Sequence, residues 1–165
     1  MPVSRITTLR QYQKKDIDRL VEKIGPALKD LPHYADTAFD PEITRATLEF
    51  NCGQDMALAG YVICNPQTDV VVGGLSIAIT HGFMSKDLYA SDIFFWIEPE
   101  WRSLANAEKL IIACRDWALR RGVKLRNIRS TVTSGYKMDK IAKLMEFMGM
   151  EPIGTIFQYR DIKHR

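Results

Sequence analysis

The segment from Ala90 to Leu110 (ASDIFFWIEPEWRSLANAEKL) constrains the fold of this chain more than any other. An apolar strand is predicted over residues 88–97, and Pro99 follows it, a residue that cannot donate to a strand ladder. A short polar loop comes next, and an amphipathic helix is predicted from Ala105. A strand joined to a helix in this way leaves free backbone N–H groups and the positive end of a helix dipole at the loop. The segment therefore predicts an α/β unit with an anion site suited to phosphate or pyrophosphate.

Length and composition are those of an ordinary globular protein, and one domain is expected over residues 1–165. The net charge of +3 is too small to imply nucleic-acid binding by itself. No apolar run approaches membrane-spanning length, and the first residues lack the apolar segment of a signal peptide. We therefore expect a cytoplasmic protein without a membrane partner. The three cysteines show no metal-ligand spacing, so free thiols and no metal site are expected.

The hydrophobic pattern predicts a mixed α/β (α+β) sheet of about six to seven strands, with helices on both faces. Hairpin-linked strands in the first half should pair antiparallel, whereas the strand–helix–strand unit from residue 88 to 132 should give parallel strands through a right-handed crossover. No G-x-G-x-x-G is present, so a doubly wound dinucleotide-binding domain is excluded. The expected strands are 3–7, 56–64, 70–80, 88–97, 125–132 and 151–160, and the expected helices are 16–28, one starting at 40–42, 105–121 and 139–148.

Basic residues gather around the end of the 105–121 helix and the strand after it. A solvated face with favourable cations at a helix C-terminus is the preferred interpretation, and a phosphate-binding patch is the alternative. The cluster consists of Arg115, Arg120, Arg121, Lys124, Arg126 and Arg129.

Two motifs resemble the GNAT (Gcn5-related N-acetyltransferase) superfamily, in a style similar to bacterial and bacteriophage members. The loop Arg102–Ala107 (R-S-L-A-N-A) is similar to the family's [Q/R]-x-x-G-x-[G/A], with Ala105 in place of the central glycine. The preceding I-E-P-E-W looks like the family's strand end. The block Ile141–Tyr159 is similar to A-x-x-L-Y-E-x-L-G-F-x-x-x-G. The element order matches over essentially the whole chain, and the motifs match from about Ser91 onward.

The resemblance implies a GNAT-like fold that binds acetyl-CoA as cosubstrate between two splayed parallel strands, here those ending near Ile97 and Thr131. It also implies direct attack of an amine acceptor on the thioester in a ternary complex. The acceptor class stays open between protein, small molecule and nucleic acid, and homodimerisation stays open too. The expected cofactor-binding residues are the backbone of Phe95, Trp96 and Ile97 for pantetheine, the N–H groups of Ser103, Leu104, Ala105, Asn106 and Ala107 for pyrophosphate, and the Arg102 side chain.

Catalytic groups are harder to assign, because Met145 stands where the family usually has its tyrosine acid. Tyr136, at the start of the same helical segment, is the candidate acid in its place. Asp92 is the candidate base, although a solvent-exposed strand-entry aspartate is an equal alternative. Three further candidates are weaker: Glu98, Glu100 and the loop residue His81. The alternative functions are a catalytically lapsed GNAT-fold protein of phage origin, used for binding or in a virion, and a GNAT-fold nucleic-acid modifier.

Overall fold

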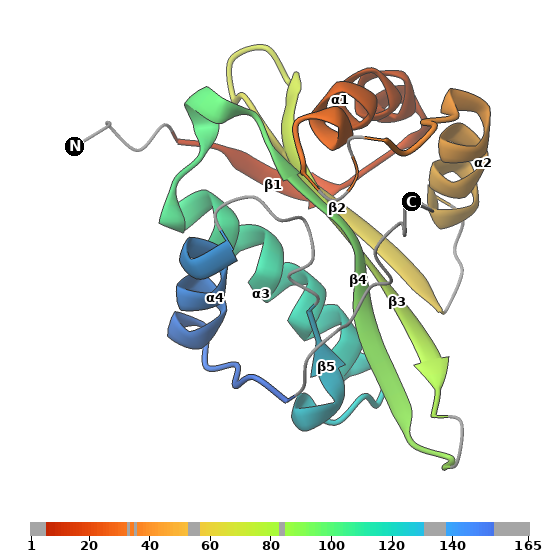
Figure 1. Cartoon of the computed structure of the whole chain (residues 1–165), viewed down its shortest axis with the longest axis vertical. Helices are drawn as coiled ribbons and strands as arrows, with labels where there is room; N and C mark the ends of the chain where they lie inside the picture. Colours follow the sequence, from red (N-terminus) through yellow and green to blue (C-terminus); the bar gives the residue numbers. More distant parts are fainter. Residues whose placement is uncertain are drawn as a thin grey trace, which may run out of the picture.

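A computed structural model describes residues 6–32, 34, 36–52, 57–82, 85–130 and 138–153 (Figure 1). Within these residues, five strands form one sheet in the order β1-β2-β3-β4-β5, and four α-helices surround it. The strands are β1 (Thr8–Gln11), β2 (Leu58–Cys64), β3 (Val71–His81), β4 (Leu88–Ile97) and β5 (Ile128–Arg129). The helices are α1 (Ile17–Lys29), α2 (Pro41–Cys52), α3 (Leu104–Arg120) and α4 (Met138–Phe147).

Neighbouring strands pair antiparallel from β1 to β4, and β4 pairs parallel with β5. The change of direction occurs at α3, which carries the chain from the end of β4 to β5, as the strand–helix–strand pattern predicts. The parallel pairing is short. It joins Ala90 to Ile128 and Ser91 to Arg129, at the beginning of β4.

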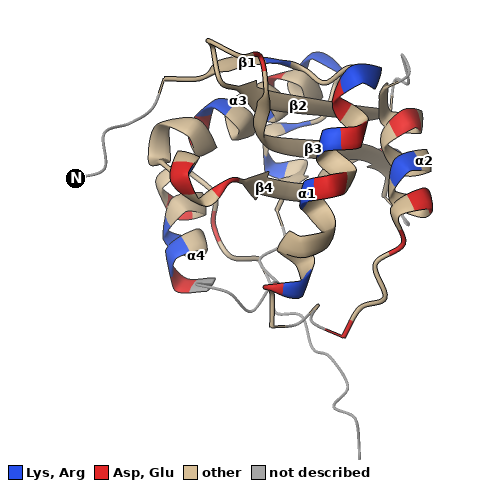
Figure 2. Cartoon of the chain, turned by 90° about the horizontal axis from the view of Figure 1, so that it is seen from above, with Lys and Arg blue, Asp and Glu red and all other residues tan. Residues whose placement is uncertain are grey.

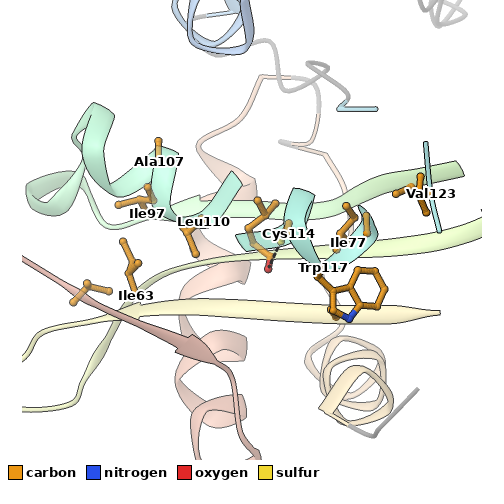
Figure 3. Close-up of a cluster of buried hydrophobic side chains, with 13 residues drawn as sticks. Ile63, Ile77, Ile97, Ala107, Leu110, Cys114, Trp117 and Val123 are labelled. Atoms are coloured by element: carbon orange, nitrogen blue, oxygen red, sulfur yellow. Dashed lines mark hydrogen bonds between the residues drawn. The ribbon is translucent and has the colours of Figure 1, made fainter. Parts of the chain in front are cut away.

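Helices cover both faces of the sheet: α1 and α2 lie on one side, and α3 lies on the other (Figure 1). The α3 side holds the larger apolar cluster, in which Leu110, Cys114 and Trp117 of α3 pack against the strands (Figure 3). The α1 side holds a second cluster built on Tyr12, Ile17, Leu20, Val21, Leu48, Val62, Cys64 and Val71. Strand residues therefore alternate between two buried faces, which is why the central strands are apolar almost throughout.

Charged residues of both signs lie along α1 and α2, while β2 and β3 contain no lysine, arginine, aspartate or glutamate (Figure 2). The start of α2 follows its sequence signal, since Asp40 Oδ1 accepts hydrogen bonds from the backbone N–H groups of Glu42 and Ile43 at 2.8 and 3.0 Å. No helix among the described residues is long and apolar enough to span a bilayer.

The mixed sheet, its antiparallel first half and its parallel crossover confirm the prediction, with three differences. Five strands are present in the described residues, against six to seven expected, and residues 151–153, where a last strand was expected to begin, are not in a strand. The first described strand is Thr8–Gln11, which lies alongside the second half of β2. Of the strand expected over 3–7, residues 6–7 are not in a strand, and residues 3–5 lie outside the described residues. Of the strand expected over 125–132, residues 125–127 form a 3₁₀ turn and two residues form β5.

Candidate functional site

An irregularity in β4 divides the strand into two halves. Phe94 pairs with Ser76 and Asp92 with Ile77, so Ile93 is an extra residue opposite β3. Such a bulge reverses the faces of the residues that follow it. Asp92, before the bulge, shares the α3 side with Ile77, and Phe95 and Ile97, after it, also pack on that side. Phe94 and Trp96 pack on the α1 side.

Beyond Ser91, one edge of β4 has no paired strand in the described part of the chain. Residues 93–97 pair with β3 on one side and have no paired strand on the other among the described residues, so this side of β4 presents an open edge. The Ile97 carbonyl at its end accepts a hydrogen bond from Arg102 Nε. Five residues at about 3.3 Å each give this open edge a length of about 17 Å. The edge ends at the loop that leads into α3. The partner strand end near Thr131 lies outside the described residues.

Side-chain hydrogen bonds from Arg102 and Asn106 hold the loop after β4 in place. A 3₁₀ turn, Pro99–Trp101, starts it, and the Arg102 Nε donates to the carbonyl of Ile97 at 2.9 Å. Asn106 fixes the other side, because its Nδ2 donates to the carbonyl of Trp101 at 2.8 Å. The Asn106 Oδ1 accepts from the hydroxyl of Thr7 at 2.7 Å, which ties the loop to the segment before β1.

The first turn of α3 leaves its earliest N–H groups available. Ser103 is the N-cap, with its Oγ accepting from Asn106 N at 3.2 Å and its carbonyl accepting from Ala107 N at 3.1 Å. The N–H groups of Ser103, Leu104 and Ala105 have no hydrogen-bond partner among the described residues. These three groups, together with the helix dipole, form the positive end that an anion would meet.

The expected pyrophosphate loop therefore has two parts. Ser103, Leu104 and Ala105 present free N–H groups, and the side chains of Leu104 and Ala105 are exposed. Asn106 and Ala107 are buried and use their N–H groups inside the helix turn, so they support the loop from below. Arg102 is exposed and binds the strand end through one nitrogen, which leaves its outer nitrogens at the surface.

The acidic candidates occupy different environments. Asp92 is half-buried, and its charge helps to raise the pKa of the Cys114 thiol well above its usual range, an effect that comes mainly from burial. Glu98 is engaged in an ion pair with Arg19 of α1 at 2.6 Å, which gives it a structural role. Glu100 and His81 are exposed. Tyr136, the candidate acid, lies outside the described residues.

Met145 lies half-buried on α4, where a thioether has no proton to donate. Several side chains of the basic cluster interact with other residues of the protein. Arg115 pairs with Asp116 at 2.9 Å, Arg121 stacks on Trp117 with 5.2 Å to the ring centroid, and Lys124 pairs with Asp87 at 2.9 Å. The preferred interpretation of a solvated helix end fits these contacts.

Two features of this region escaped the sequence reasoning. One is the role of the Asn106 side chain, which joins residues 99 positions apart and leaves no local pattern. The other is a hollow at the opposite end of β4, lined by polar residues and by Arg129. The polarity of residues 81–87 predicts a loop beside this hollow, but no local pattern in the sequence brings Arg129 to it.

Comparison with known proteins gives matches at the level of structure only. No protein-family model and no curated protein matches the sequence. Three similar solved structures are an acetyltransferase of Trypanosoma brucei (14% identity, TM-score 0.69, covering 94% of this chain and 99% of that one), glucosamine-6-phosphate N-acetyltransferase of Arabidopsis thaliana (11%, 0.72, 95% and 99%), and AAC(6′)-Iy in complex with the bisubstrate analogue CoA-S-monomethyl-acetylneamine (18%, 0.72, 95% and 99%). These likenesses extend over nearly the full length of each protein. The chain therefore has the fold of the GNAT acetyltransferases.

Proposed function

We propose that this protein is an acetyl-CoA-dependent N-acetyltransferase. The observation that carries the proposal is the open edge of β4, which begins after Ser91 and runs directly to the free N–H groups of α3. An extended chain with amide groups can pair with such an edge as an added strand does. A pyrophosphate can bind at the N-terminus of the helix. Acetyl-CoA carries both chemical features in one molecule, and acetyltransferases share this fold.

In this proposal, different residues bind different parts of acetyl-CoA. The N–H groups of Ser103, Leu104 and Ala105 bind the pyrophosphate, and the small side chain of Ala105 allows it to approach. Arg102 adds a charged contact from its outer nitrogens. The backbone of residues 95–97 pairs with the pantetheine amides. An arm that follows the open edge from the loop brings the thioester to Asp92, the first residue beyond the last parallel pair.

Acetyl-CoA supplies an activated acetyl group as a thioester. The nitrogen of the acceptor amine attacks the carbonyl carbon, an N–C bond forms, and the C–S bond breaks. The amine loses one proton and the leaving thiolate gains one. In this proposal Asp92 accepts the first proton, directly or through water. Tyr136 or water donates the second, since the leaving thiolate is only weakly basic and does not need a strong acid.

The acceptor is an amine. Because the Met145 thioether has no proton to donate, we keep a second candidate function. In it, a protein of this fold binds acetyl-CoA without transferring the acetyl group. The two candidates share the cofactor site and differ in turnover. A cytoplasmic location, a bacteriophage source and a homodimer stay predictions of the sequence.

Titration calorimetry with acetyl-CoA tests the proposal, with Ala105→Glu as the key variant. We expect micromolar binding by the native protein and at least tenfold weaker binding by Ala105→Glu, because the added carboxylate occupies and repels the phosphate position. The fold should tolerate the change, since Ala105 is exposed and glutamate is favourable in the first turn of a helix. Ala46→Glu makes the same substitution at an exposed position of α2 and should bind normally.

Turnover is then measured as free-thiol release with a panel of amines. Thiol release that needs an amine and falls at least tenfold in Asp92→Asn supports transfer with Asp92 as base. Binding without release identifies the binding-only candidate. No binding at millimolar acetyl-CoA would contradict the proposal altogether.

A further inference from the structure

A polar hollow of about 370 Å³ lies at the far end of β4, remote from the α3 loop. Its volume is in the range of small-ligand sites. It is placed between the β3–β4 hairpin end and the beginning of the parallel β4–β5 pair. The residues that line it are Thr80, His81, Gly82, Ser85, Tyr89, Ser91 and Arg129. Apart from Gly82, every one of them carries a hydrogen-bonding group or a charge.

The positive charge at this hollow comes from Arg129. Its guanidinium stacks on the ring of Tyr89, 4.5 Å from the centroid, which fixes its position while leaving its N–H groups in the plane free to bind. No carboxylate among the described residues pairs with Arg129. Gly82 makes room for this arrangement, since a Cβ there would lie 2.6 Å from the Tyr89 ring.

Asp87, the acidic residue in the β3–β4 hairpin loop, does not neutralise the charge of Arg129. Asp87 is paired with Lys124 at 2.9 Å, and that contact, with a further contribution from Arg126, holds the pKa of its carboxyl below the usual range. Hydroxyl groups from Thr80, Ser85 and Ser91 add hydrogen-bond donors around the hollow. A guanidinium with surrounding hydroxyl donors is the chemistry that binds phosphate or carboxylate.

The hollow is also next to the place where the proposed reaction occurs. Ser91 and Arg129, two of its lining residues, form the last parallel pair before the edge of β4 opens. Asp92 follows immediately on the strand. The Asp92 side chain lies on the α3 side and Ser91 on the opposite face, so an acceptor that reaches the thioester at the open edge from the Ser91 face would extend its remaining part toward Arg129.

We propose that the hollow around Arg129 binds an anionic group, a phosphate or a carboxylate, of the amine acceptor, so that the protein selects anionic amines over neutral or polycationic ones. This inference rests on the proposed acetyl transfer for its place in catalysis. The binding of an anion by the hollow can be measured without it.

The test compares matched pairs of amines that differ by one anionic group. The pairs are glucosamine 6-phosphate with glucosamine, phosphoethanolamine with ethanolamine, and 4-aminobutyrate with butylamine, and kanamycin serves as a polycationic probe. Calorimetry on protein saturated with CoA gives the dissociation constants, and thiol release gives kcat/KM. We expect the anionic amine to be preferred at least tenfold within the phosphate pairs, within the carboxylate pair, or within both. The pairs that show the preference identify whether the anion is a phosphate or a carboxylate. Kanamycin should be bound most weakly.

Arg129→Gln should remove most of that preference, and Arg129→Lys should keep part of it. Arg126→Gln is the matched control, because it removes one positive charge from an exposed arginine of the same segment that does not line the hollow. Equal binding within every pair, or a preference that Arg129→Gln leaves unchanged, would overturn the inference.

The two proposals fail in different ways. If acetyl-CoA binds and is turned over but Arg129 has no influence on selectivity, the inference is wrong and the acetyltransferase proposal stands. If acetyl-CoA does not bind, the calorimetric comparison of the same pairs on the free protein still decides whether the hollow binds an anion.

Discussion

Replacing Asn106 by alanine should loosen the loop at the start of α3 and lower the stability of the whole chain. Asn106 is 1% exposed and makes two side-chain hydrogen bonds, one from the Thr7 hydroxyl at 2.7 Å and one to the Trp101 carbonyl at 2.8 Å. Each buried hydrogen bond contributes about 1 kcal/mol net, and a hydroxyl donor left without its acceptor adds about 1 kcal/mol more. We therefore expect Asn106→Ala to reduce the free energy of unfolding by about 2–3 kcal/mol, a large share of the typical 5–15 kcal/mol.

Urea unfolding followed by circular dichroism measures this change, and a double-mutant cycle assigns it. Thr7→Val removes the partner of Asn106 Oδ1 while keeping the shape of the side chain. The coupling energy between the two substitutions should be about 1 kcal/mol, the value of one hydrogen bond. A loss below 0.5 kcal/mol in Asn106→Ala, or additive effects in the cycle, would refute the idea that this side chain holds the loop.

The same variant links stability to cofactor binding. Asn127 is the matched control, as another buried asparagine whose Nδ2 donates to a backbone carbonyl, that of Leu88, at 3.0 Å. Asn127→Ala should also lose stability, but it lies away from the α3 loop and should bind acetyl-CoA normally. Asn106→Ala should bind acetyl-CoA several times more weakly at a temperature where both variants are folded. Equal affinities would mean that the loop keeps its shape without Asn106.

Two further predictions concern packing and the thiols. Gly60→Ala should lower the free energy of unfolding by about 1–3 kcal/mol or more, because a Cβ there would lie 1.7 Å from the buried Tyr12 ring, and denaturant unfolding with no measurable loss would contradict this. Ellman's reagent at pH 8 should label only Cys52 in the native protein, and slowly, since burial raises the pKa of its thiol and raises that of Cys64 to about 11, and the thiolate is the reactive form. All three thiols should react after unfolding, and rapid labelling of two or more in the native state would be inconsistent with the described core.

The strongest sequence signals were those confined to one element. The bounds of β4 were predicted to the residue, because an apolar run between a polar hairpin and Pro99 leaves little choice. Helix α3 was predicted within one residue at each end, from its apolar stripe and the glycine at position 122, which adopts φ +85°. The parallel pairing of β4 with β5 followed from the strand–helix–strand order alone.

Features that depend on pairing across the sheet were not predictable from the sequence. The extra residue at Ile93 has no glycine or other local signal, yet it decides that Phe95 and Asp92 face the same side. β1 was placed too early, because its position depends on the register with β2 and its own residues alternate weakly. The division of the α3 loop into free and internally bonded N–H groups likewise depends on how Ser103 caps the helix.

In the proposed complex, acetyl-CoA occupies the open edge of β4 and the first turn of α3. Amide hydrogen exchange, read residue by residue with and without acetyl-CoA, tests it most directly, since unpaired edge amides exchange fast until something binds them. We expect acetyl-CoA to slow exchange within residues 93–97 and at residues 103–105 in the native protein and in Ala46→Glu, and to have no such effect in Ala105→Glu. Protection that appears elsewhere, or no protection at saturating acetyl-CoA, would contradict it.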